Sequence, residues 1–366
     1  HPYLLSERLA RAATVADVSA LVGSTRVFAG TVAALNASPQ LFELKRFDLA
    51  IIDEASQIPE AYLLGTLAAR HGAGDAIARF VMIGDNKQLP AVVAQSPDAS
   101  AVTDPMLRSI GLTDCRLSLF DRLLALYGDD GDIVSMLTRQ GRMHEGVADF
   151  PNHAFYGGRL GIVPLPHQTG TEQPPASCTD SLHALIATRR LAFVAAPAPD
   201  GAAPTSKTNP VEAAMTAAAV CAARDISTAP DPARAIGVIV PFRNQIAAVR
   251  AAIDRLDPAL HDVTVDTVER YQGSQRDTII YSTTVHTPAQ LDFLTATTAA
   301  DPSGTLIDRK LNVALTRARR HTIVIGNPAL LSQAPVYAML IGYAKDKNAY
   351  IDVPPADFCT GNFDLP

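Results

Sequence analysis

Two adjacent carboxylates, Asp53 and Glu54, follow a short apolar run at residues 49–52. The run predicts a buried strand, and in open α/β sheets ligands bind just outside the carboxyl ends of the strands. An aspartate there can hold Mg²⁺ through water, and a neighbouring glutamate can orient or deprotonate an attacking water. The pair therefore fits the metal and base positions of a nucleotide hydrolase, although alone it also fits a strand that ends in a solvated acidic turn.

A second apolar run, at residues 80–83, is followed by the polar segment Gly84-Asp85-Asn86-Lys87-Gln88. Gly84 permits a tight turn, and the Gln88 amide can both donate and accept a hydrogen bond. Such an amide can contact a phosphate oxygen or an attacking water and so sense a γ-phosphate. Alone, Gly-Asp-Asn after a strand is more often an ordinary β-turn. Two successive strands that each end in residues of this kind favour a nucleotide site instead.

These two segments resemble motifs II and III of the superfamily 1 helicases, and most of all the branch that contains the nonsense-mediated-decay helicase. Further segments resemble motifs of that family in the family's order. They are the Gln-Tyr-Arg-Met-His motif at 137–144 and its sequel at 155–160, the Ser-x-x-Asn-x-x-Glu segment at 206–213, the strand and turn at 236–245, motif V at 267–277 and motif VI at 311–319. The matches span about residues 25–330, most of the chain.

The resemblance implies the core of an ATP-dependent helicase or translocase that uses Mg²⁺ and moves along single-stranded DNA or RNA. Asp53 would hold the metal, Glu54 would activate water and Gln88 would sense the γ-phosphate. Arg142 and Arg317 stand where the family places arginine fingers. A guanidinium suits that task because it stays charged and offers a planar fork of donors to the charge that develops on the phosphate.

The family pattern implies two further sets of contacts. Nucleotide-contacting residues would be Gln140, Gly273 and Gln275, and nucleic-acid-contacting residues would be Thr31, Pro241, Arg243 and Thr267. Two substitutions depart from the pattern, because Gly141 replaces a tyrosine and Gln275 replaces a glutamate. Both changes weaken recognition of the base and ribose more than they affect hydrolysis.

No Gly-x-x-x-x-Gly-Lys-[Ser/Thr] loop occurs in the 366 residues. That loop cradles the β- and γ-phosphates in related nucleotide hydrolases. The chain begins at His1 and enters the family pattern partway through the first domain. We therefore expect an upstream part of the same protein to carry the loop, with natural loss as the alternative. The competing function is a catalytically inactive scaffold that binds nucleic acid or a protein partner.

The predicted fold class is α/β, with two RecA-like domains whose mainly parallel sheets are flanked by helices. Apolar runs alternate with alanine-rich stretches of helical period, which indicates crossover helices between parallel strands. The expected strands are 49–52, 80–83, 236–240, 278–281 and 322–326, and the expected helices are 211–224 and 245–256. Residues 1–127 would form a partial first domain and 128–366 the second, with 128–134 as linker. We interpret 161–205 as a surface excursion with one strand at about 190–195, and 286–305 as a loop.

Composition sets further bounds. The net charge of −6 argues against a globally basic nucleic-acid binder but not against a local basic groove. No apolar run reaches 18 residues, so a membrane span is not supported and a cytoplasmic location is expected. The scattered cysteines, Cys115, Cys178, Cys221 and Cys359, indicate reduced and mostly buried thiols. We expect structural roles for His144, Glu145 and His153, and helix-end positions for Arg319, Arg320 and His321.

Overall fold

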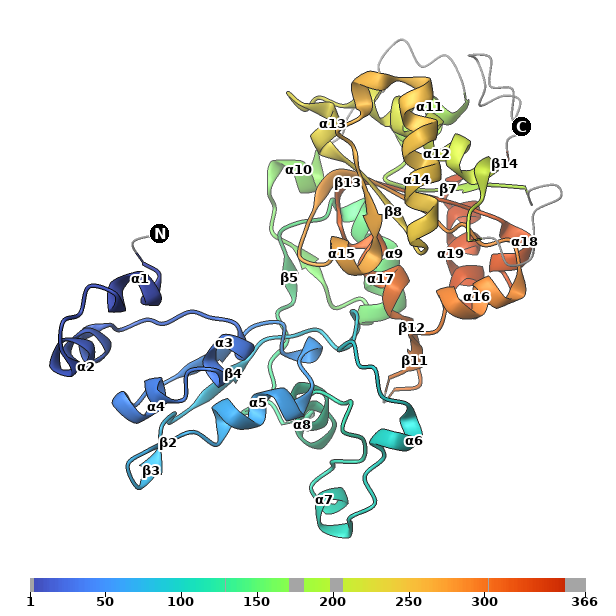
Figure 1. Cartoon of the computed structure of the whole chain (residues 1–366). Coiled ribbons are helices and arrows are strands. Elements are labelled where there is room, and N and C mark those ends of the chain that lie inside the picture. The colour runs from blue at the N-terminus through green and yellow to red at the C-terminus, as the bar shows by residue number, and fades with distance from the viewer. Residues whose placement is uncertain (1–2, 129, 171–180, 198–206, 302, 353–366) are drawn as a thin grey trace. The chain divides into compact units, whose positions relative to one another are not determined.

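The structure is a computed structural model that describes residues 3–128, 130–170, 181–197, 207–301 and 303–352. The chain forms two compact units (Figure 1). Unit 1 comprises residues 1–86 and 90–135, and unit 2 comprises residues 87–89 and 136–366. The three residues 87–89 thus belong to unit 2, although the chain on both sides of them belongs to unit 1.

Unit 2 is built on a six-stranded sheet in which every strand runs parallel to its neighbours. Its order is β14-β7-β13-β10-β8-β9. The strands are β7 (Leu191–Ala195), β8 (Ile236–Val240), β9 (Thr264–Thr267), β10 (Arg276–Ser282), β13 (Ala318–Gly326) and β14 (Tyr350–Asp352). The short strands β5 (Arg139–Gln140) and β6 (Gly161–Ile162) pair with each other, as do β11 (Thr298–Ala300) and β12 (Leu306–Asp308).

Helices cover both faces of this sheet (Figure 1). One face is covered by α11 (Ser181–Thr188), α12 (Pro210–Ile226) and α14 (Arg243–Leu256), and the other by α9 (Glu145–Tyr156), α17 (Arg309–Leu315) and α19 (Pro335–Asp346). Shorter helices connect them: α10 (Pro166–Thr169), α13 (Pro232–Ala235), α15 (Val268–Tyr271), α16 (Pro288–Leu294), α18 (Pro328–Leu331) and the 3₁₀ turn Pro258–Leu260.

The alternation of side chains along each strand explains this layering. In β10, Ile279 and Tyr281 join the apolar cluster under α9, α17 and α19, whereas Ile280 joins the cluster under α12 and α14. Parallel strands that are buried on both faces read as continuous apolar runs, which is what the sequence shows. Each such fully buried side chain stabilises the fold by roughly 1.5–3 kcal/mol. The α/β prediction is therefore confirmed in unit 2.

Unit 1 has a smaller parallel sheet. Its strands β1 (Ala50–Ile52) and β4 (Phe80–Met82) pair in parallel, and a hairpin joins β2 (Arg70–His71) to β3 (Gly74–Asp75). The helices are α1 (Leu5–Leu9), α2 (Val15–Ser24), α3 (Val32–Asn36), α4 (Gln40–Leu44), α5 (Glu60–Leu67), α6 (Pro97–Ser100), α7 (Pro105–Ser109) and α8 (Leu119–Tyr127), with a 3₁₀ turn at Ala55–Gln57.

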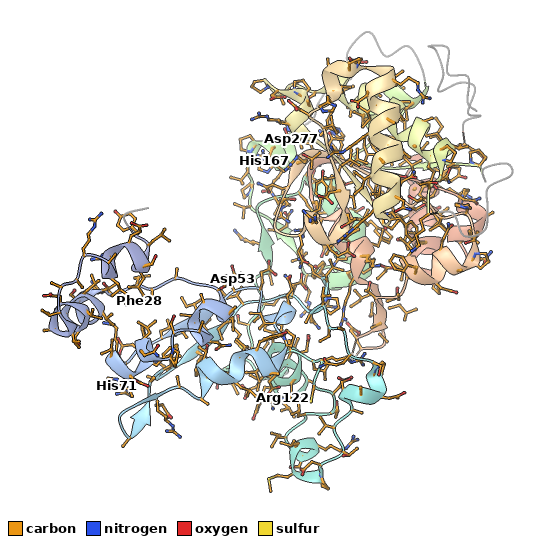
Figure 2. The ribbon with its side chains drawn as sticks, viewed as in Figure 1. Phe28, Asp53, His71, Arg122, His167 and Asp277 are labelled. Atoms are coloured by element: carbon orange, nitrogen blue, oxygen red, sulfur yellow. The ribbon has the colours of Figure 1, made fainter. Side chains whose placement is uncertain are left out.

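Two local contacts hold unit 1 together. The ring of Phe47 meets those of Phe28 and Phe42 edge-on, beside the small core of Phe42, Ala76 and Ile77 (Figure 2 labels Phe28). Arg122 of α8 donates from Nε to the buried carboxylate of Glu60 in α5 at 2.7 Å (Figure 2). Since both side chains of this ion pair are 11% exposed, it fixes α8 against α5 more firmly than a surface pair would.

The strands β1 and β4 and the residues next to them carry apolar side chains that nothing in the described residues covers fully. Leu49, Ile51, Val81 and Ile83 are 45%, 63%, 46% and 46% exposed. Parallel sheets normally have both faces covered. The β1–β4 sheet thus differs from the sheet of unit 2, whose strands β7 and β8 are buried along their whole length.

The structure confirms the five predicted strands, the further strand expected at about 190–195, which is β7, and both alanine-rich helices. Two interpretations were wrong. Residues 181–195 are not a surface excursion, because α11 covers the sheet and all five residues of β7 are buried inside it. The segment 286–305 is not a loop throughout, because it contains α16 and β11. Parts of the excursion, residues 171–180 and 198–206, lie outside the described residues.

Cys115 and Cys221 are free thiols, as predicted, but the expected burial is wrong for Cys115, which is exposed, while Cys221 is half-buried. Burial raises the pKa of the Cys221 thiol to about 11, so it is protonated at neutral pH. Cys178 and Cys359 lie outside the described residues. No helix in the described ranges is long and apolar enough to cross a membrane.

Candidate functional site

Asp53 and Glu54 lie at the carboxyl end of β1, where the sequence predicted them (Figure 2 labels Asp53). Both side chains are exposed, and Asp53 Oδ1 accepts the Glu54 backbone N–H at 3.0 Å. Glu54 has φ 51° and ψ 37°, a left-handed conformation that non-glycine residues rarely adopt. Such strained residues cluster at functional sites. An exposed aspartate also fits Mg²⁺, which usually takes one or two carboxylates and keeps several waters.

The ends of β1 and β4 are joined by hydrogen bonds. Ala55 N–H donates to Ile83 O at 2.8 Å, and the Ser56 hydroxyl exchanges hydrogen bonds with the backbone of Asp85 at 3.2 Å. A Cβ at Gly84 would lie 3.0 Å from the Ser56 nitrogen. Gly84 suits this close approach, because a side chain there would need the acidic turn to shift slightly away from β4.

In unit 2, the Arg317 guanidinium is buried and contacts Gln88. Arg317 is 2% exposed, and its Nη2 donates to Gln88 Oε1 at 3.0 Å and to Thr316 Oγ1 at 3.1 Å. Its Nε donates to Val313 O at 3.1 Å, which fixes the side chain against the end of α17. Gln88, from the segment that resembles motif III, and Arg317, from the segment that resembles motif VI, are thus in contact although they lie 229 positions apart in the chain.

Arg142 lies in the same network. Its Nη1 donates to Thr316 O at 3.1 Å and its Nε to Gln275 Oε1 at 3.0 Å. Thr316 therefore contacts both proposed fingers, through its carbonyl and through its hydroxyl. Gln275 is exposed and accepts from Arg142 as a neutral amide.

The loop that carries Arg142 is held by Gln140. Its amide oxygen accepts the backbone N–H groups of Arg142 and Met143, at 2.9 and 2.7 Å, and its Nε2 donates to Met143 O at 2.8 Å. The structure thus gives Gln140 a local positioning role, and its contact with nucleotide stays a prediction. Gly273, with φ 78°, is exposed and has open space where a Cβ would lie.

Sequence reasoning missed the residues of α10 that clasp this loop. His167 Nε2 lies 3.0 Å from Arg142 O, and Gln168 Nε2 donates to Gln140 O and Met143 O (Figure 2 labels His167). Gln168 is fully buried. A histidine and a glutamine in a proline-rich stretch carry no recognisable signal, since their partners are backbone carbonyls more than 20 residues away.

Three of the four candidate nucleic-acid contacts gather at the carboxyl edge of β8 and β9. Pro241 and Arg243 directly follow β8, Thr267 ends β9, and Val240 and Thr267 are paired in register. Arg243 is exposed, whereas Pro241 and Thr267 are buried. The fourth, Thr31, lies in unit 1 and caps α3 by accepting Ala34 N–H at 3.1 Å. Their binding of nucleic acid stays a prediction.

Glu212, within the Ser-x-x-Asn-x-x-Glu segment, belongs to α12. Its carboxyl is fully buried against the carboxyl end of β10. Its oxygens accept from Thr284 N at 2.6 Å, Ser282 Oγ at 2.9 Å and Asn209 Nδ2 at 3.2 Å. Burial raises the pKa of Glu212 to about 8, against the opposing effect of the hydrogen bonds from Thr284 and Ser282. Thr284 has φ 63°, a strained value for a β-branched residue, and Glu212 holds it there.

The placing of Arg319, Arg320 and His321 at a helix end was wrong. The helix α17 ends at Leu315, and all three residues belong to β13. Arg319 pairs with Asp277 at 3.2 Å, and burial lowers the pKa of His321 to about 3 (Figure 2 labels Asp277). His144 has a structural role, since its ring accepts Gly146 N–H at the start of α9.

The structure thus brings four of the predicted residues, Gln88, Arg142, Gln275 and Arg317, into one network within unit 2. Asp53 and Glu54 lie together in unit 1. Their convergence with the arginines on a single cleft stays a prediction.

Comparison with known proteins gives the same family as the motifs. Models described as AAA domain match residues 6–96 and 115–329. A DNA replication ATP-dependent helicase/nuclease of Arabidopsis thaliana is 29% identical over 94% of this chain and 23% of its own length. A regulator of nonsense transcripts 1 homolog of the same plant is 30% identical over 84% of this chain and 22% of its own.

The chain spans less than a quarter of either of these two relatives. The solved PRRSV helicase aligns with 79% of this chain and 36% of its own, at 15% identity and a TM-score of 0.35, which is too loose to add to the topology above. The AAA domain matches cover more than half of the chain and coincide with the ordered motifs. The chain therefore belongs to the AAA-domain superfamily 1 helicases.

Proposed function

We propose that this chain is the motor core of an ATP-dependent helicase or translocase acting on single-stranded nucleic acid. The observation that carries the proposal is the hydrogen bond from Arg317 Nη2 to Gln88 Oε1 at 3.0 Å. A buried guanidinium in contact with an amide that can sense phosphate is an arrangement suited to phosphoryl transfer, where catalysis depends on positioned cations. A solvated surface arginine would instead satisfy its N–H groups with water.

In this proposal Asp53 holds Mg²⁺ and Glu54 orients and deprotonates the attacking water. The metal would supply charge neutralisation at the β- and γ-phosphates. Glu54 is held by its own backbone conformation and by Gln57, whose Nε2 donates to Glu54 Oε2. A base fixed in one orientation loses less entropy when it meets its substrate.

Arg142 and Arg317 would stabilise the charge that builds on the γ-phosphate. Both guanidinium groups donate to Thr316, which places them in one hydrogen-bond network. Gln88 would keep its Oε1 on Arg317 and offer its Nε2 to a phosphate oxygen when ATP binds. We further propose that Gly273 and Gln275 lie close to the nucleotide, with Gln140 supporting them through the Arg142 loop.

The exposed β1–β4 sheet supports an upstream segment of the same protein as the source of the phosphate loop. Ile51 and Val81 are 63% and 46% exposed on a parallel sheet that would ordinarily be covered. Additional strands and a covering helix would bury these side chains. We propose that residues 1–127 complete a first RecA-like domain with that segment and that residues 128–366 form the second.

Nucleic acid would bind along the carboxyl edge of β8 and β9, near Pro241, Arg243 and Thr267, and near Thr31 of unit 1. The matched relatives include one named for DNA replication and one named for nonsense transcripts, so both DNA and RNA are candidate substrates. The scattered cysteines without a C-x-x-C pair favour a reducing compartment, and we propose the cytoplasm.

The experiment that tests the proposal is ATP hydrolysis by the full-length protein with no nucleic acid, with single-stranded DNA and with RNA. Stimulation by either polymer supports the motor function and identifies the substrate. Binding of nucleic acid with no turnover under any condition would favour the inactive scaffold instead.

A further inference from the structure

The segment Lys87–Leu89 is embedded in unit 2, apart from the chain on both sides of it. Leu89 is 6% exposed and belongs to the apolar cluster under α9 and α17. Asn312 of α17 donates from Nδ2 to Lys87 O at 2.7 Å and to the Tyr156 hydroxyl at 2.9 Å. The Lys87 carbonyl and the Leu89 side chain are therefore both held in unit 2.

The Lys87 ammonium pairs with Asp301, the first residue of the turn between β11 and β12. Its Nζ donates to Asp301 Oδ2 at 2.9 Å, and the two side chains are 15% and 12% exposed. The other carboxylate oxygen, Oδ1, accepts from Ser303 N at 2.9 Å and from Thr305 N at 3.0 Å. Asp301 thus closes the hairpin turn with one oxygen and faces Lys87 with the other.

The hairpin is in turn fixed to the helix that leads to Arg317. Asp308 at the end of β12 accepts Leu311 N at 2.9 Å as the N-cap of α17, and it accepts Thr298 Oγ1 of β11 at 3.0 Å. The hairpin therefore joins Asp301, which directly follows β11, to α17, which directly follows β12. Lys87 is paired with the hairpin at Asp301, and Arg317 lies just after the end of α17.

We propose that Asp301 is a positioning residue, which clamps Lys87 so that the adjacent Gln88 amide stays on the Arg317 guanidinium. The Gln88 side chain is long, and a fixed backbone at both neighbours helps to keep its oxygen 3.0 Å from Arg317 Nη2. Lys87 supplies the fixed point on one side and buried Leu89 the fixed point on the other. Lys87 and Asp301 would act through Gln88 and would not contact the reacting phosphate themselves.

Loss of the Lys87–Asp301 ion pair should destabilise the segment, because both side chains are largely buried. Burial would raise the pKa of Asp301, but hydrogen bonds from Ser303 and Lys87 outweigh it and lower the pKa to about 2, so the carboxylate is charged at neutral pH. Removing one partner of a poorly hydrated pair leaves the other charge without compensation. An exposed pair such as Arg70–Asp75, with side chains 66% and 72% exposed, contributes far less.

The direct test uses trypsin on the 366-residue chain. Trypsin cleaves after lysine, so the rate of cleavage after Lys87 reports how often this segment opens. The rate of cleavage at the 87–88 bond is followed by mass spectrometry. We expect Asp301→Asn to speed this cleavage about tenfold, since proteolysis follows the population of the opened segment. Asp301→Glu and Lys87→Arg keep the charges and should stay protected.

The matched control is Asp75→Asn, which removes a carboxylate of the exposed pair in unit 1 and should leave the 87–88 bond as slow as in the wild type. Melting curves of all variants exclude global unfolding as the cause. Cleavage of Asp301→Asn at the wild-type rate would overturn the clamp.

The catalytic consequence rests on the proposed function and is measured separately on the full-length protein. Asp301→Asn should lower kcat for ATP at least several-fold with KM changed by less than about twofold, because a positioning role acts on turnover and not on nucleotide affinity. An unchanged kcat with an opened 87–88 bond would overturn the positioning role alone. A wild-type protein without ATPase activity would instead overturn the proposed function, and the trypsin result would still decide the clamp.

Discussion

At the scale of single residues, Glu54 differs from other exposed glutamates in its strained backbone, with φ 51°, and we propose it as the catalytic base. Glu54→Gln removes the proton acceptor while it keeps the size and polarity of the side chain. We expect ATP binding to persist and hydrolysis by the full-length protein to fall about 10²–10⁴-fold, the usual contribution of a general base. Glu43→Gln, on the exposed face of α4, is the control and should hydrolyse ATP normally.

Arg317 allows a second test at this scale. Arg317→Ala should lower turnover by roughly 10³–10⁵-fold, as expected when an arginine finger is lost. Arg317→Lys keeps the charge but not the fork of donors, so it should recover only part of the rate. Arg234, which is 79% exposed in its side chain, offers the control, and its replacement by Ala should leave turnover unchanged. Equal rates for wild type and Arg317→Ala would remove the finger from the mechanism.

At the scale of elements, the sequence predicted the strands best where apolar residues run without interruption. The run Thr322–Ile325 is buried on both faces, and its β-branched residues favour a strand. The same run explains an error, because β13 extends back to Ala318 and takes in Arg319 and His321, which had looked like a helix end. The clasp of His167 on Arg142 was unpredictable, since a contact between a side chain and a distant carbonyl leaves no pattern in the sequence.

Glu212 joins α12 to the end of β10 and makes the stability of unit 2 depend on pH. Its pKa in the folded state, about 8, lies above the ordinary value of 4.5. The stabilisation is therefore fully present below about pH 4.5 and is lost as the pH rises through about 8. Urea unfolding should show that the stability of the wild type relative to Glu212→Gln declines between pH 5 and pH 8.5. A difference that stays constant over this range would mean that Glu212 is already ionised when buried.

At the scale of the whole molecule, the two units differ in how completely they are built. Unit 2 has a six-stranded sheet with both faces covered, whereas the β1–β4 sheet of unit 1 leaves Ile51 63% exposed. Sequence patterns predicted the parallel strands of both but gave no sign of this difference, because Ile51 sits in an apolar run like those of buried strands. The degree of burial depends on neighbouring elements that the run itself does not specify.

The isolated 366 residues should therefore bind ATP poorly. They supply a metal carboxylate, a base and two arginines, but no glycine-rich loop whose backbone N–H groups and lysine would anchor the β-phosphate. We expect hydrolysis no faster than the uncatalysed background, together with weak and salt-sensitive binding of single-stranded nucleic acid at the β8–β9 edge. Equilibrium binding of a fluorescent ATP analogue and of a labelled oligonucleotide measures both, and the full-length protein should bind the analogue tightly. Robust ATPase activity from the isolated chain would show that another of its segments holds the phosphates, and the upstream loop would then be unnecessary.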